Sequence, residues 1–465
     1  MRDRRGSGTC SGWVMRPANG KPGTLGSLLQ RGAHAAPALI DRGVTWTYGQ
    51  LRDAVDRQRA LLLAAGVRPG DRVMVISENC AAQVALLFAI AGIDAWIVNV
   101  NARLSSVELA AIAAHCGARL VITIDAGAAV FGALNVHCTP EPDVEVAALI
   151  YTTGTTGDPK GVMLTRANLL FVAQASSTLR AVVATDRAYG VLPISHVYGF
   201  TSVLLGTLYA GACVVLESRF TPAALLAALP GLTILQGVPA MYARVLDALG
   251  EGRIASTLRF LYAGGSPLDP ALKGRVERAF GLPLHNGYGL TETAPTVSQT
   301  RLDAPRSDSS VGFAIPGVEV KLVGEELWVR GPNVMRGYYK GAAAVDAHGW
   351  FNTGDMARID ADGAIFITGR TKELIIRSGF NVYPLDVETA INAHPGVALS
   401  AVVGRPLADG NEEVVAYVQP RAGCTPDLHD WLVERLAPYK RPARIVLLDA
   451  LPAAPNGKVL KHRLD

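Results

Sequence analysis

The stretch from Tyr151 to Thr165 combines the residue types that hold phosphate groups. It contains five threonines, three glycines and one lysine, Lys160. Glycines let backbone N–H groups approach phosphate oxygens, hydroxyl groups can donate further hydrogen bonds, and the lysine supplies a positive charge. The apolar run 147–151 precedes the loop and predicts a buried strand. We expect phosphate contacts from Thr152, Thr153, Gly154, Thr155, Thr156, Gly157 and Lys160.

This loop differs from a Walker A motif, which requires Ser or Thr directly after Gly-Lys. Here Pro159 precedes Lys160, and Gly161 follows it. The alternative is a polar Gly/Thr turn between a strand and a hairpin. So many threonines and glycines around one lysine are unusual for such a turn, and we therefore favour a phosphate-binding loop.

The motif HNGYGLTE at 285–292 has the residues needed to bind a purine and a metal ion. The ring of Tyr288 lies between two glycines and could stack on a purine. Asn286 could pair with the amino edge of adenine, and Glu292 is a carboxylate suited to Mg²⁺ near phosphates. The alternative is a strand end with a buried tyrosine and a surface glutamate, so this interpretation depends on the other motifs.

The composition excludes several classes of protein. A length of 465 residues suggests two or three structural units, and 49% hydrophobic residues are ample for a large core. The 44 basic and 40 acidic residues leave a net charge of +4, which gives no case for nucleic-acid binding. The apolar stretch 81–100 is interrupted by Gln83 and Asp94, so we expect no stable membrane insertion.

The cysteines and the N-terminal residues bear on the cellular compartment of the protein. The six cysteines are scattered without a CxxC pair, so neither a zinc site nor a disulfide is expected. This pattern favours a reducing compartment, and we predict a cytoplasmic protein. Residues 1–27 are basic and Gly-rich without an apolar segment; they predict a disordered tail rather than a secretory signal, and Met15 is an alternative start.

The order of predicted elements indicates an α/β protein. Helices and strands alternate between 28 and 124, which is typical of an α/β sheet. Two segments, 233–241 and 260–268, read as strands followed by Gly/Pro turns. They are candidate pocket walls, because ligands bind at the carboxyl ends of strands in open α/β sheets. Past Arg301 the pattern is β-rich, including a predicted strand region at 311–323, and the last ~90 residues suit a small α+β domain.

The stretch Tyr151–Thr165 resembles the AMP-binding signature of the acyl-adenylate-forming superfamily, which includes acyl-CoA synthetases, firefly luciferase and the adenylation domains of peptide synthetases. Further motifs resembling those of the family follow in the expected order at 192–199, 285–292, 353–355, 369–384 and 451–459. The resemblance extends from about residue 28 to the C-terminus. It implies a large multi-subdomain N-terminal α/β domain with a β-rich part, 28–370, and a small mobile C-terminal α+β domain, 371–465.

The resemblance is strongest to the acid–CoA ligase branch and implies a two-step reaction. The carboxylate of the acid attacks the α-phosphate of ATP and releases pyrophosphate, and the acyl group then passes from the adenylate to coenzyme A. ATP, Mg²⁺ and CoA are the implied cofactors. Apolar residues around Tyr198 and Met241 favour an apolar or aromatic acid. Dicarboxylate-using relatives tend to carry an arginine where this chain has Gly287, which argues against malonate.

The resemblance also implies roles for individual residues. Lys160, His196, Thr291 and Lys458 would be catalytic, with His196 facing the acyl carboxylate, and Glu292 would bind the metal. Outside the phosphate loop, the implied ligand-binding residues are Gly264, Gly265, Asn286, Gly287, Tyr288, Gly289, Thr291, Asp355, Arg370, Lys372, Gly379 and Lys458. Lys372 matches the hinge position and Gly379 the path of the CoA thiol. The alternatives are a helix-entry histidine satisfied by the backbone and, for Asp355, an ordinary turn aspartate.

Three readings of the whole chain stay open. The first is the acid–CoA ligase, and the second is an adenylating enzyme that delivers its acyl group to a carrier protein or an amine. The third is a degenerate, non-enzymatic ATP-binding protein. The acid and the oligomeric state, monomer or dimer, are left open. Family members usually have more chain than this sequence has at 125–145, so a strand or hairpin is expected to be missing there.

Overall fold

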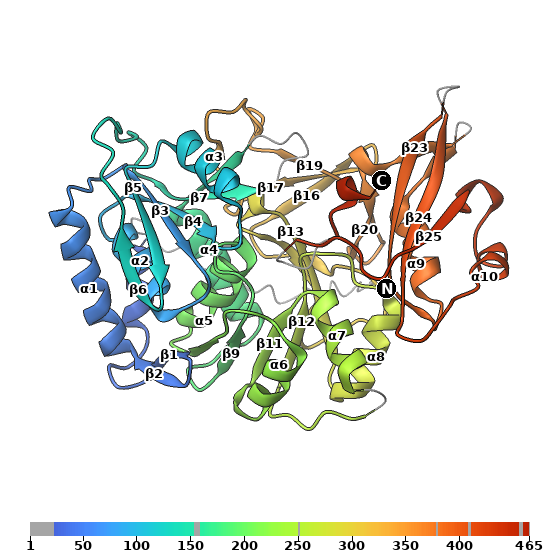
Figure 1. Cartoon of the computed structure of the whole chain (residues 1–465), viewed down its shortest axis with the longest axis horizontal. Helices are drawn as coiled ribbons and strands as arrows, with labels where there is room; N and C mark the ends of the chain where they lie inside the picture. Colours follow the sequence, from blue (N-terminus) through green and yellow to red (C-terminus); the bar gives the residue numbers. More distant parts are fainter. Residues whose placement is uncertain are drawn as a thin grey trace, which may run out of the picture.

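The computed structural model describes residues 23–152, 159–249, 252–377, 380–407, 411–454 and 459–464. Within these residues two large sheets form the main body, a third sheet lies beside them, and the C-terminal strands form a separate layer at one end (Figure 1). This arrangement agrees with the α/β fold and the small α+β domain that the sequence predicts.

The first large sheet carries the predicted phosphate loop. Its strands are β3 (Arg72–Ser77), β4 (Trp96–Asn101), β5 (Leu120–Asp125), β6 (Ala128–Phe131), β7 (Val146–Thr152), β8 (Lys160–Thr165) and β18 (Gly337–Tyr338), in the order β18-β8-β7-β4-β3-β5-β6. The four strands β5, β3, β4 and β7 are parallel, and β8 returns antiparallel to β7. The loop 153–158 therefore joins two neighbouring strands at the carboxyl end of a parallel strand.

The second large sheet carries the predicted pocket walls. Its strands are β1 (Pro37–Asp41), β2 (Val44–Thr47), β9 (Arg187–Gly190), β10 (Cys213–Leu216), β11 (Ile234–Gly237), β12 (Phe260–Ala263), β13 (Leu284–Gly289), β14 (Thr296–Gln299) and β15 (Phe313–Ala314). Their order is β15-β14-β13-β12-β11-β9-β10-β1-β2. The strands β9, β11, β12 and β13 are parallel, so the turns after them share one edge of the sheet.

Ten α-helices accompany the strands in the described residues. They are α1 (Tyr48–Ala64), α2 (Ala81–Ala91), α3 (Ser106–Cys116), α4 (Arg166–Leu179), α5 (Gly206–Tyr209), α6 (Pro222–Ala228), α7 (Pro239–Leu249), α8 (Pro270–Phe280), α9 (Pro384–Asn392) and α10 (His429–Val433). Of these, α2 and α4 contribute to the core between the two large sheets. The other helical segments are the π-helix η2 (Tyr198–Leu205) and the 3₁₀ helices η1 (Leu25–Gln30), η3 (Leu229–Gly231), η4 (Thr291–Thr293), η5 (Thr371–Glu373), η6 (Pro438–Lys440) and η7 (Lys461–Arg463).

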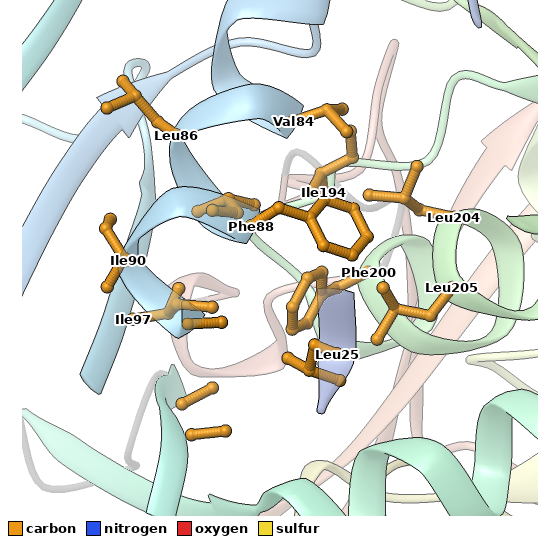
Figure 2. Close-up of a cluster of buried hydrophobic side chains, with 14 of the residues drawn as sticks. Leu25, Val84, Leu86, Phe88, Ile90, Ile97, Ile194, Phe200, Leu204 and Leu205 are labelled. Atoms are coloured by element: carbon orange, nitrogen blue, oxygen red, sulfur yellow. The ribbon is translucent and has the colours of Figure 1, made fainter. Parts of the chain in front are cut away.

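The core between the sheets is centred on α2 and η2. All residues of α2 except Ala82 are buried. The apolar sequence of this helix is therefore explained by its place in the protein core. Phe88 of α2 points toward Phe200 of η2, and Ile194 lies beside them (Figure 2). Leu25 belongs to the same cluster and is 2% exposed. The described residues 23–27 thus include part of the segment that we predicted as a tail, while residues 1–22 of that segment lie outside the described residues.

Helix starts follow directly from the sequence. Thr47 and Gln50 form a reciprocal capping box at the start of α1, and Ser105 with Glu108 does the same for α3. Thr165 closes the phosphate-loop hairpin and caps α4 through Asn168. The helix that we expected after the loop is therefore fixed at the residue where β8 ends.

Two predictions about β-structure need correction. The region 311–323 forms two strands in different sheets, because Gly312 and Gly317 have φ of +77° and +87° and turn the chain between them. The third sheet contains β16 (Glu319–Val323), β17 (Glu326–Arg330), β19 (Phe351–Ile359) and β20 (Ile365–Arg370). The segment 125–145 is short but includes β6, which forms a hairpin with β5 at the edge of the first sheet.

The C-terminal part has its own core. Its strands are β21 (Ile375–Arg377), β22 (Phe380–Val382), β23 (Val397–Pro406), β24 (Glu412–Pro420) and β25 (Arg444–Leu447). The helix α9 packs on β23, and an apolar cluster joins the two. Between the described residues of this part and the main body, Tyr383 donates to Glu325 at 2.8 Å and Arg421 donates to Asp247 of α7 at 2.6 Å.

Candidate active site

Asp355 is the buried member of a polar cluster on the β19–β20 hairpin. It pairs across the hairpin with Arg370, whose Nε lies 2.8 Å from Oδ1 of Asp355. The hydroxyl of Tyr288, from the end of β13, donates to Oδ2 at 2.5 Å. Asp355 is 2% exposed, and burial together with its negative charge raises the pKa of Tyr288 well above the ordinary value. Two predicted site residues from two other motifs, Tyr288 and Arg370, therefore meet at the Asp355 carboxylate.

A tight turn orients this carboxylate. Gly354 has φ of +67°, and its N–H donates to the side chain of Asn352 at 2.8 Å. The hydroxyl of Thr353 accepts from the Asp355 N–H and donates to the Leu327 carbonyl. A residue with a side chain at 354 would be strained in this conformation. The Thr-Gly-Asp motif thus forms a defined turn, and this turn directs Asp355 toward Arg370 and Tyr288.

A second cluster joins the phosphate-loop hairpin to Glu292. Lys160, the first residue of β8, has its Nζ 3.6 Å from the ring centroid of Tyr338 on β18. The hydroxyl of Tyr338 donates to Oε1 of Glu292 at 2.7 Å. Burial, followed by the negative charge of Glu292, raises the pKa of this tyrosine. One aromatic side chain therefore contacts both the cation and the carboxylate that the sequence assigns to phosphates and metal.

Tyr338 is a site residue that sequence reasoning missed. It lies in the two-residue strand β18, which pairs with Met163 and Val162 of β8. Nothing in its local sequence marks it as functional, because its partners lie in two other motifs. A useful signal would have been the Gly-Tyr-Tyr sequence at 337–339, where an aromatic residue follows a glycine with φ of +144°.

Several predicted glycines are required by close packing. A Cβ at Gly289 would lie 1.6 Å from the Pro295 carbonyl oxygen, and one at Gly287 would lie 1.7 Å from the Tyr262 hydroxyl. Gly265 has φ of +83°, and Gly264 faces the ring of Tyr198 at 3.4 Å. These glycines let the strand ends approach one another, a need that is separate from the ligand-binding role that we predict for them.

The side chain of Asn286 has partners within the protein. Its amide nitrogen donates to the Ser310 carbonyl at 3.2 Å, and its oxygen accepts from the Gly287 N–H at 3.0 Å. It is 3% exposed. A hydrogen bond from this side chain to adenine would compete with these contacts, so the predicted pairing remains a prediction.

His196 lies at a narrow cavity beside the second sheet. The cavity measures about 10 Å³ and is lined by Leu192, Pro193, His196, Tyr198, Val238 and Gly265. Nδ1 of His196 accepts from the Tyr198 N–H at 3.3 Å, which is the kind of backbone contact that the alternative reading expects. The same histidine nevertheless reaches the cavity, so both readings are compatible with its position.

The other predicted residues lie as follows. Thr152 ends β7 opposite Lys160, Thr291 begins η4 beside Glu292, and Lys372 is exposed on η5. Outside the described residues lie Thr153, Gly154, Thr155, Thr156, Gly157, Gly379 and Lys458. Throughout the described ranges, no group of three or more His, Cys, Asp or Glu residues could hold a metal ion. A metal at Glu292 would therefore need further ligands from a bound phosphate or from water.

His285, at the start of the nucleotide-binding motif, makes stability depend on pH. Its pKa is lowered from 6.5 to about 4, mainly by burial, with smaller contributions from the positive charges of Lys273 and Arg180, while the charge of Glu277 opposes the shift. The unfolded chain binds this proton near pH 6.5 and the folded chain only near pH 4. The contribution of neutral His285 to the free energy of unfolding should therefore be fully present above pH 6.5. It should fall by about 3 kcal/mol as the pH drops to 4.

This pH dependence can be measured by urea unfolding between pH 4 and pH 7. The variant His285→Gln should lack this part of the decline, while His348→Gln, an exposed histidine on a surface turn, should behave like the wild type. An identical slope in the wild type and in His285→Gln would contradict the assignment.

Comparison with known proteins identifies the class to which these clusters belong. The model of the AMP-binding enzyme family matches residues 30–144 and 134–339, and the model of the AMP-binding enzyme C-terminal domain matches 386–458. The chain belongs to the AMP-binding enzyme family. The resemblance inferred from its motifs is thereby confirmed.

Individual relatives match over nearly the whole chain. A feruloyl-CoA synthase of Amycolatopsis sp is 36% identical, covering 94% of this chain and 97% of the relative. A 2-succinylbenzoate–CoA ligase of Geobacillus kaustophilus is 32% identical, covering 95% and 97%. Among solved structures, ATP-bound MatB from Rhodopseudomonas palustris superposes with a TM-score of 0.85 at 29% identity, covering 94% and 97%. Relatives and neighbours alike are adenylating enzymes, most of them named as CoA ligases or synthetases.

The lengths and polarity of the helices bear on the prediction that the chain does not insert stably into a membrane. Within the described part of the chain, every helix is too short or too polar to traverse a bilayer.

Proposed function

We propose that this enzyme is an ATP-dependent acid–CoA ligase that activates an apolar or aromatic carboxylic acid as acyl-AMP and transfers the acyl group to coenzyme A. The observation that carries the proposal is the similarity to a feruloyl-CoA synthase over 94% of this chain. The Asp355 and Glu292 clusters support it, because they supply the carboxylates and cations that such a reaction needs.

The first half-reaction requires positioning and charge neutralisation more than covalent chemistry by the protein. Asp355 would accept hydrogen bonds from the ribose hydroxyls, with Arg370 and Tyr288 holding the carboxylate in place. Lys160 and the threonines of the loop would bind the β- and γ-phosphates, and Thr291 would lie near the α-phosphate. Lys458 would bridge the acid carboxylate and the α-phosphate as negative charge develops there.

The residues present fit a magnesium ion that is shared with the phosphates. Mg²⁺ is commonly bound by one or two carboxylates together with substrate phosphates, and Glu292 supplies one carboxylate beside the phosphate-loop lysine. When bound, the ion would supply positive charge that stabilises the displaced pyrophosphate. Glu292 would hold it, and Tyr338 would orient the oxygen of Glu292 that it contacts.

The second half-reaction requires the thiol of CoA to reach the adenylate. We propose that the C-terminal part rotates about Lys372 and that the segment around Gly379 then lines the path of the thiol. The contacts of Tyr383 with Glu325 and of Arg421 with Asp247 are exposed, so separating these described residues would cost little and is compatible with such a motion. Acid, ATP and CoA would be the small-molecule partners. Unpaired thiols at Cys80, Cys116, Cys138, Cys213 and Cys424 support a cytoplasmic location.

A second candidate is an adenylating enzyme whose acyl acceptor is an amine or a carrier protein. One observation favours it: the amide bond synthetase McbA from Marinactinospora thermotolerans superposes with a TM-score of 0.84 at 25% identity, covering 95% of this chain and 98% of that structure. This neighbour shares the fold but uses a different acceptor according to its name. The acceptor therefore has to be tested directly.

The decisive experiment measures pyrophosphate release over aliphatic, aromatic and amino acids, with and without CoA, and identifies the products by mass spectrometry. An acid–CoA ligase should show acid-dependent pyrophosphate release and form the acyl-CoA only when CoA is present. Acid-dependent release with no acyl-CoA product would favour the second candidate. Tight ATP binding without turnover for any acid would indicate a non-enzymatic protein.

Tyr338→Phe should weaken the binding of Mg²⁺ together with ATP. The aromatic ring under Lys160 stays in place in this variant. The substitution removes only the hydrogen bond to Glu292, so the carboxylate is less well oriented. Loss of such an outer contact commonly costs 10- to 100-fold in metal affinity, and we expect the Mg²⁺ concentration for half-maximal ATP binding to rise roughly 10-fold. Calorimetric titration of ATP at several Mg²⁺ concentrations measures this directly.

The neighbouring residue provides a matched control. Tyr339 also donates its hydroxyl to a glutamate, Glu141, at 2.6 Å, but away from the phosphate loop. Tyr339→Phe should therefore keep the Mg²⁺ dependence of the wild type. If Tyr338→Phe and Tyr339→Phe titrate alike, Tyr338 does not orient the metal ligand.

A further inference from the structure

A buried arginine lies behind the cavity that His196 lines. Arg180 directly follows α4 and is 1% exposed. Its guanidinium donates to the side-chain oxygens of Gln236 on β11 and Gln299 on β14, the latter at 3.2 Å. Its Cζ lies 4.1 Å from the ring centroid of Tyr262. Across the described ranges, no carboxylate forms an ion pair with this cation.

A buried arginine without a carboxylate partner lowers the stability of the fold, so we ask whether its charge has a function. Burying a guanidinium without a counter-ion carries a large desolvation penalty, and two amide oxygens and an aromatic face compensate it only in part. The nearby Arg259, at the same end of α4, has the ordinary solution: it forms an ion pair with Asp186. Arg180 is therefore a preorganised positive charge that, among the described residues, has amide and aromatic partners but no carboxylate.

The side chain between Arg180 and the cavity also lacks an acceptor. The rings of Tyr198 and Tyr262 meet edge to face with centroids 6.5 Å apart, and Tyr198 lines the cavity. Within the described part of the chain, the buried hydroxyl of Tyr198 has no hydrogen-bond partner. Burial raises the pKa of Tyr198 well above the ordinary value, and the charge of Arg180 opposes this shift. The hydroxyl is therefore a neutral donor next to a buried cation.

Position 287 cannot supply the cation for this pocket. Any side chain there would collide with the Tyr262 hydroxyl, since a Cβ would lie only 1.7 Å from it. Tyr262 fills that space, and Arg180 contacts the ring of the same tyrosine. A positive charge near the cavity, next to Tyr262 and Tyr198, thus comes from the end of α4 and not from the motif at 285–292.

We propose that Arg180, together with the hydroxyl of Tyr198, selects carboxylic acids that carry an oxygen acceptor at the end remote from the reacting carboxylate. The acceptor is a phenolic hydroxyl, a carbonyl or a second carboxylate. A plain hydrocarbon end would leave the Tyr198 hydroxyl buried and unpaired and would bring no acceptor to the Arg180 charge, and a buried donor left unpaired makes a binding site discriminate strongly. The cavity has room for about one water molecule, so the side chains of its wall must move apart for the acid to enter. During this movement Gln236, Gln299 and Tyr262 would keep Arg180 in position.

This inference rests on the proposed acid–CoA ligase and refines its substrate class. The test compares kcat/KM for acyl-CoA formation from 3-phenylpropenoic acid and its 4-hydroxy, 4-acetyl and 4-carboxy derivatives. The wild type should prefer at least one oxygen-bearing derivative over the parent acid by roughly 10- to 100-fold, as expected for a hydrogen bond to a charged group. The preferred derivative identifies the acceptor chemistry.

Two arginine variants then assign the preference. Arg180→Met should remove most of this ratio, and Arg180→Lys should keep part of it because the charge remains. Arg259→Met, which removes an arginine at the same end of α4 but outside the pocket, should lower stability without changing the ratio.

The outcomes separate this inference from the proposed function. Equal kcat/KM of the wild type for all four acids would overturn the inference, even if the arginine variants fail to fold. An unchanged ratio in Arg180→Met would also overturn it and leave Arg180 as a tie between strands. Absence of acyl-CoA from every acid in the wider panel, with no pyrophosphate release, would instead overturn the proposed function.

Discussion

Asp355→Ala is expected to weaken ATP binding by roughly 10²-fold and to lower the stability of the β19–β20 hairpin. ATP would lose the two hydrogen bonds that its ribose hydroxyls donate to the Asp355 carboxylate. Hydrogen bonds to a charged group contribute about 1.5–3 kcal/mol each. The substitution also leaves Arg370 and the Tyr288 hydroxyl without their shared acceptor. Isothermal calorimetry with ATP and thermal unfolding of the free protein measure the two effects separately.

The same strand offers a control for this experiment. Asp360 is a partly exposed aspartate in the turn after β19 and pairs with Arg358, so Asp360→Ala should leave ATP affinity unchanged. Asp355→Asn keeps one oxygen acceptor and should fall between the wild type and the alanine variant. Wild-type ATP affinity in Asp355→Ala would remove this residue from the nucleotide site, whatever happens to stability.

Lys458→Ala should slow adenylation by roughly 10²- to 10³-fold, the size expected for removing one preorganised group that stabilises developing charge. We expect this lysine to act in only one orientation of the C-terminal part. Given synthetic acyl-adenylate and CoA, the variant should therefore form thioester at nearly the wild-type rate. Single-turnover kinetics of both half-reactions distinguishes this outcome from a general loss of activity.

Lys372→Pro should show the opposite pattern. Proline fixes φ near −65° and restricts the torsion that a hinge at this position requires. Glu373, the next residue, forms an ion pair with Lys461 at 2.8 Å, and Lys461 also pairs with Glu388 of α9. Because Glu373 is held by the C-terminal part, rotation would occur just before it. If Lys458→Ala slows both steps equally, or Lys372→Pro slows neither, the alternating-domain account is wrong for this enzyme.

The parts of the fold that depend on local sequence were predictable. The bounds of α1 follow from a capping box and a helical repeat of apolar residues, and both strands flanking the phosphate loop are apolar runs ended by polar loop residues. The division of 311–323 into two strands was not predictable. It depends on Gly312 packing against the backbone at Gln299, which a local pattern cannot reveal.

The same distinction holds for the candidate site. Residues within one motif, such as Tyr288 and Glu292, were found because their types and spacing suggest chemistry together. Tyr338 lies 46 positions from Glu292, and Arg180 lies 119 positions from Gln299. Each is ordinary in its own segment and becomes significant only when the fold brings its partners together.

The distribution of thiols gives this enzyme a natural attachment point for a reporter. Among the cysteines that the structure describes, Cys424 is exposed, whereas Cys80, Cys116, Cys138 and Cys213 are buried. Burial also raises the pKa of Cys116 and of Cys213 to about 11, so little reactive thiolate forms there at neutral pH. Cys424 follows β24 near Arg421, which contacts α7. After Cys10→Ser, a maleimide dye at Cys424 would follow separation of the C-terminal part from α7 in real time without any engineered cysteine.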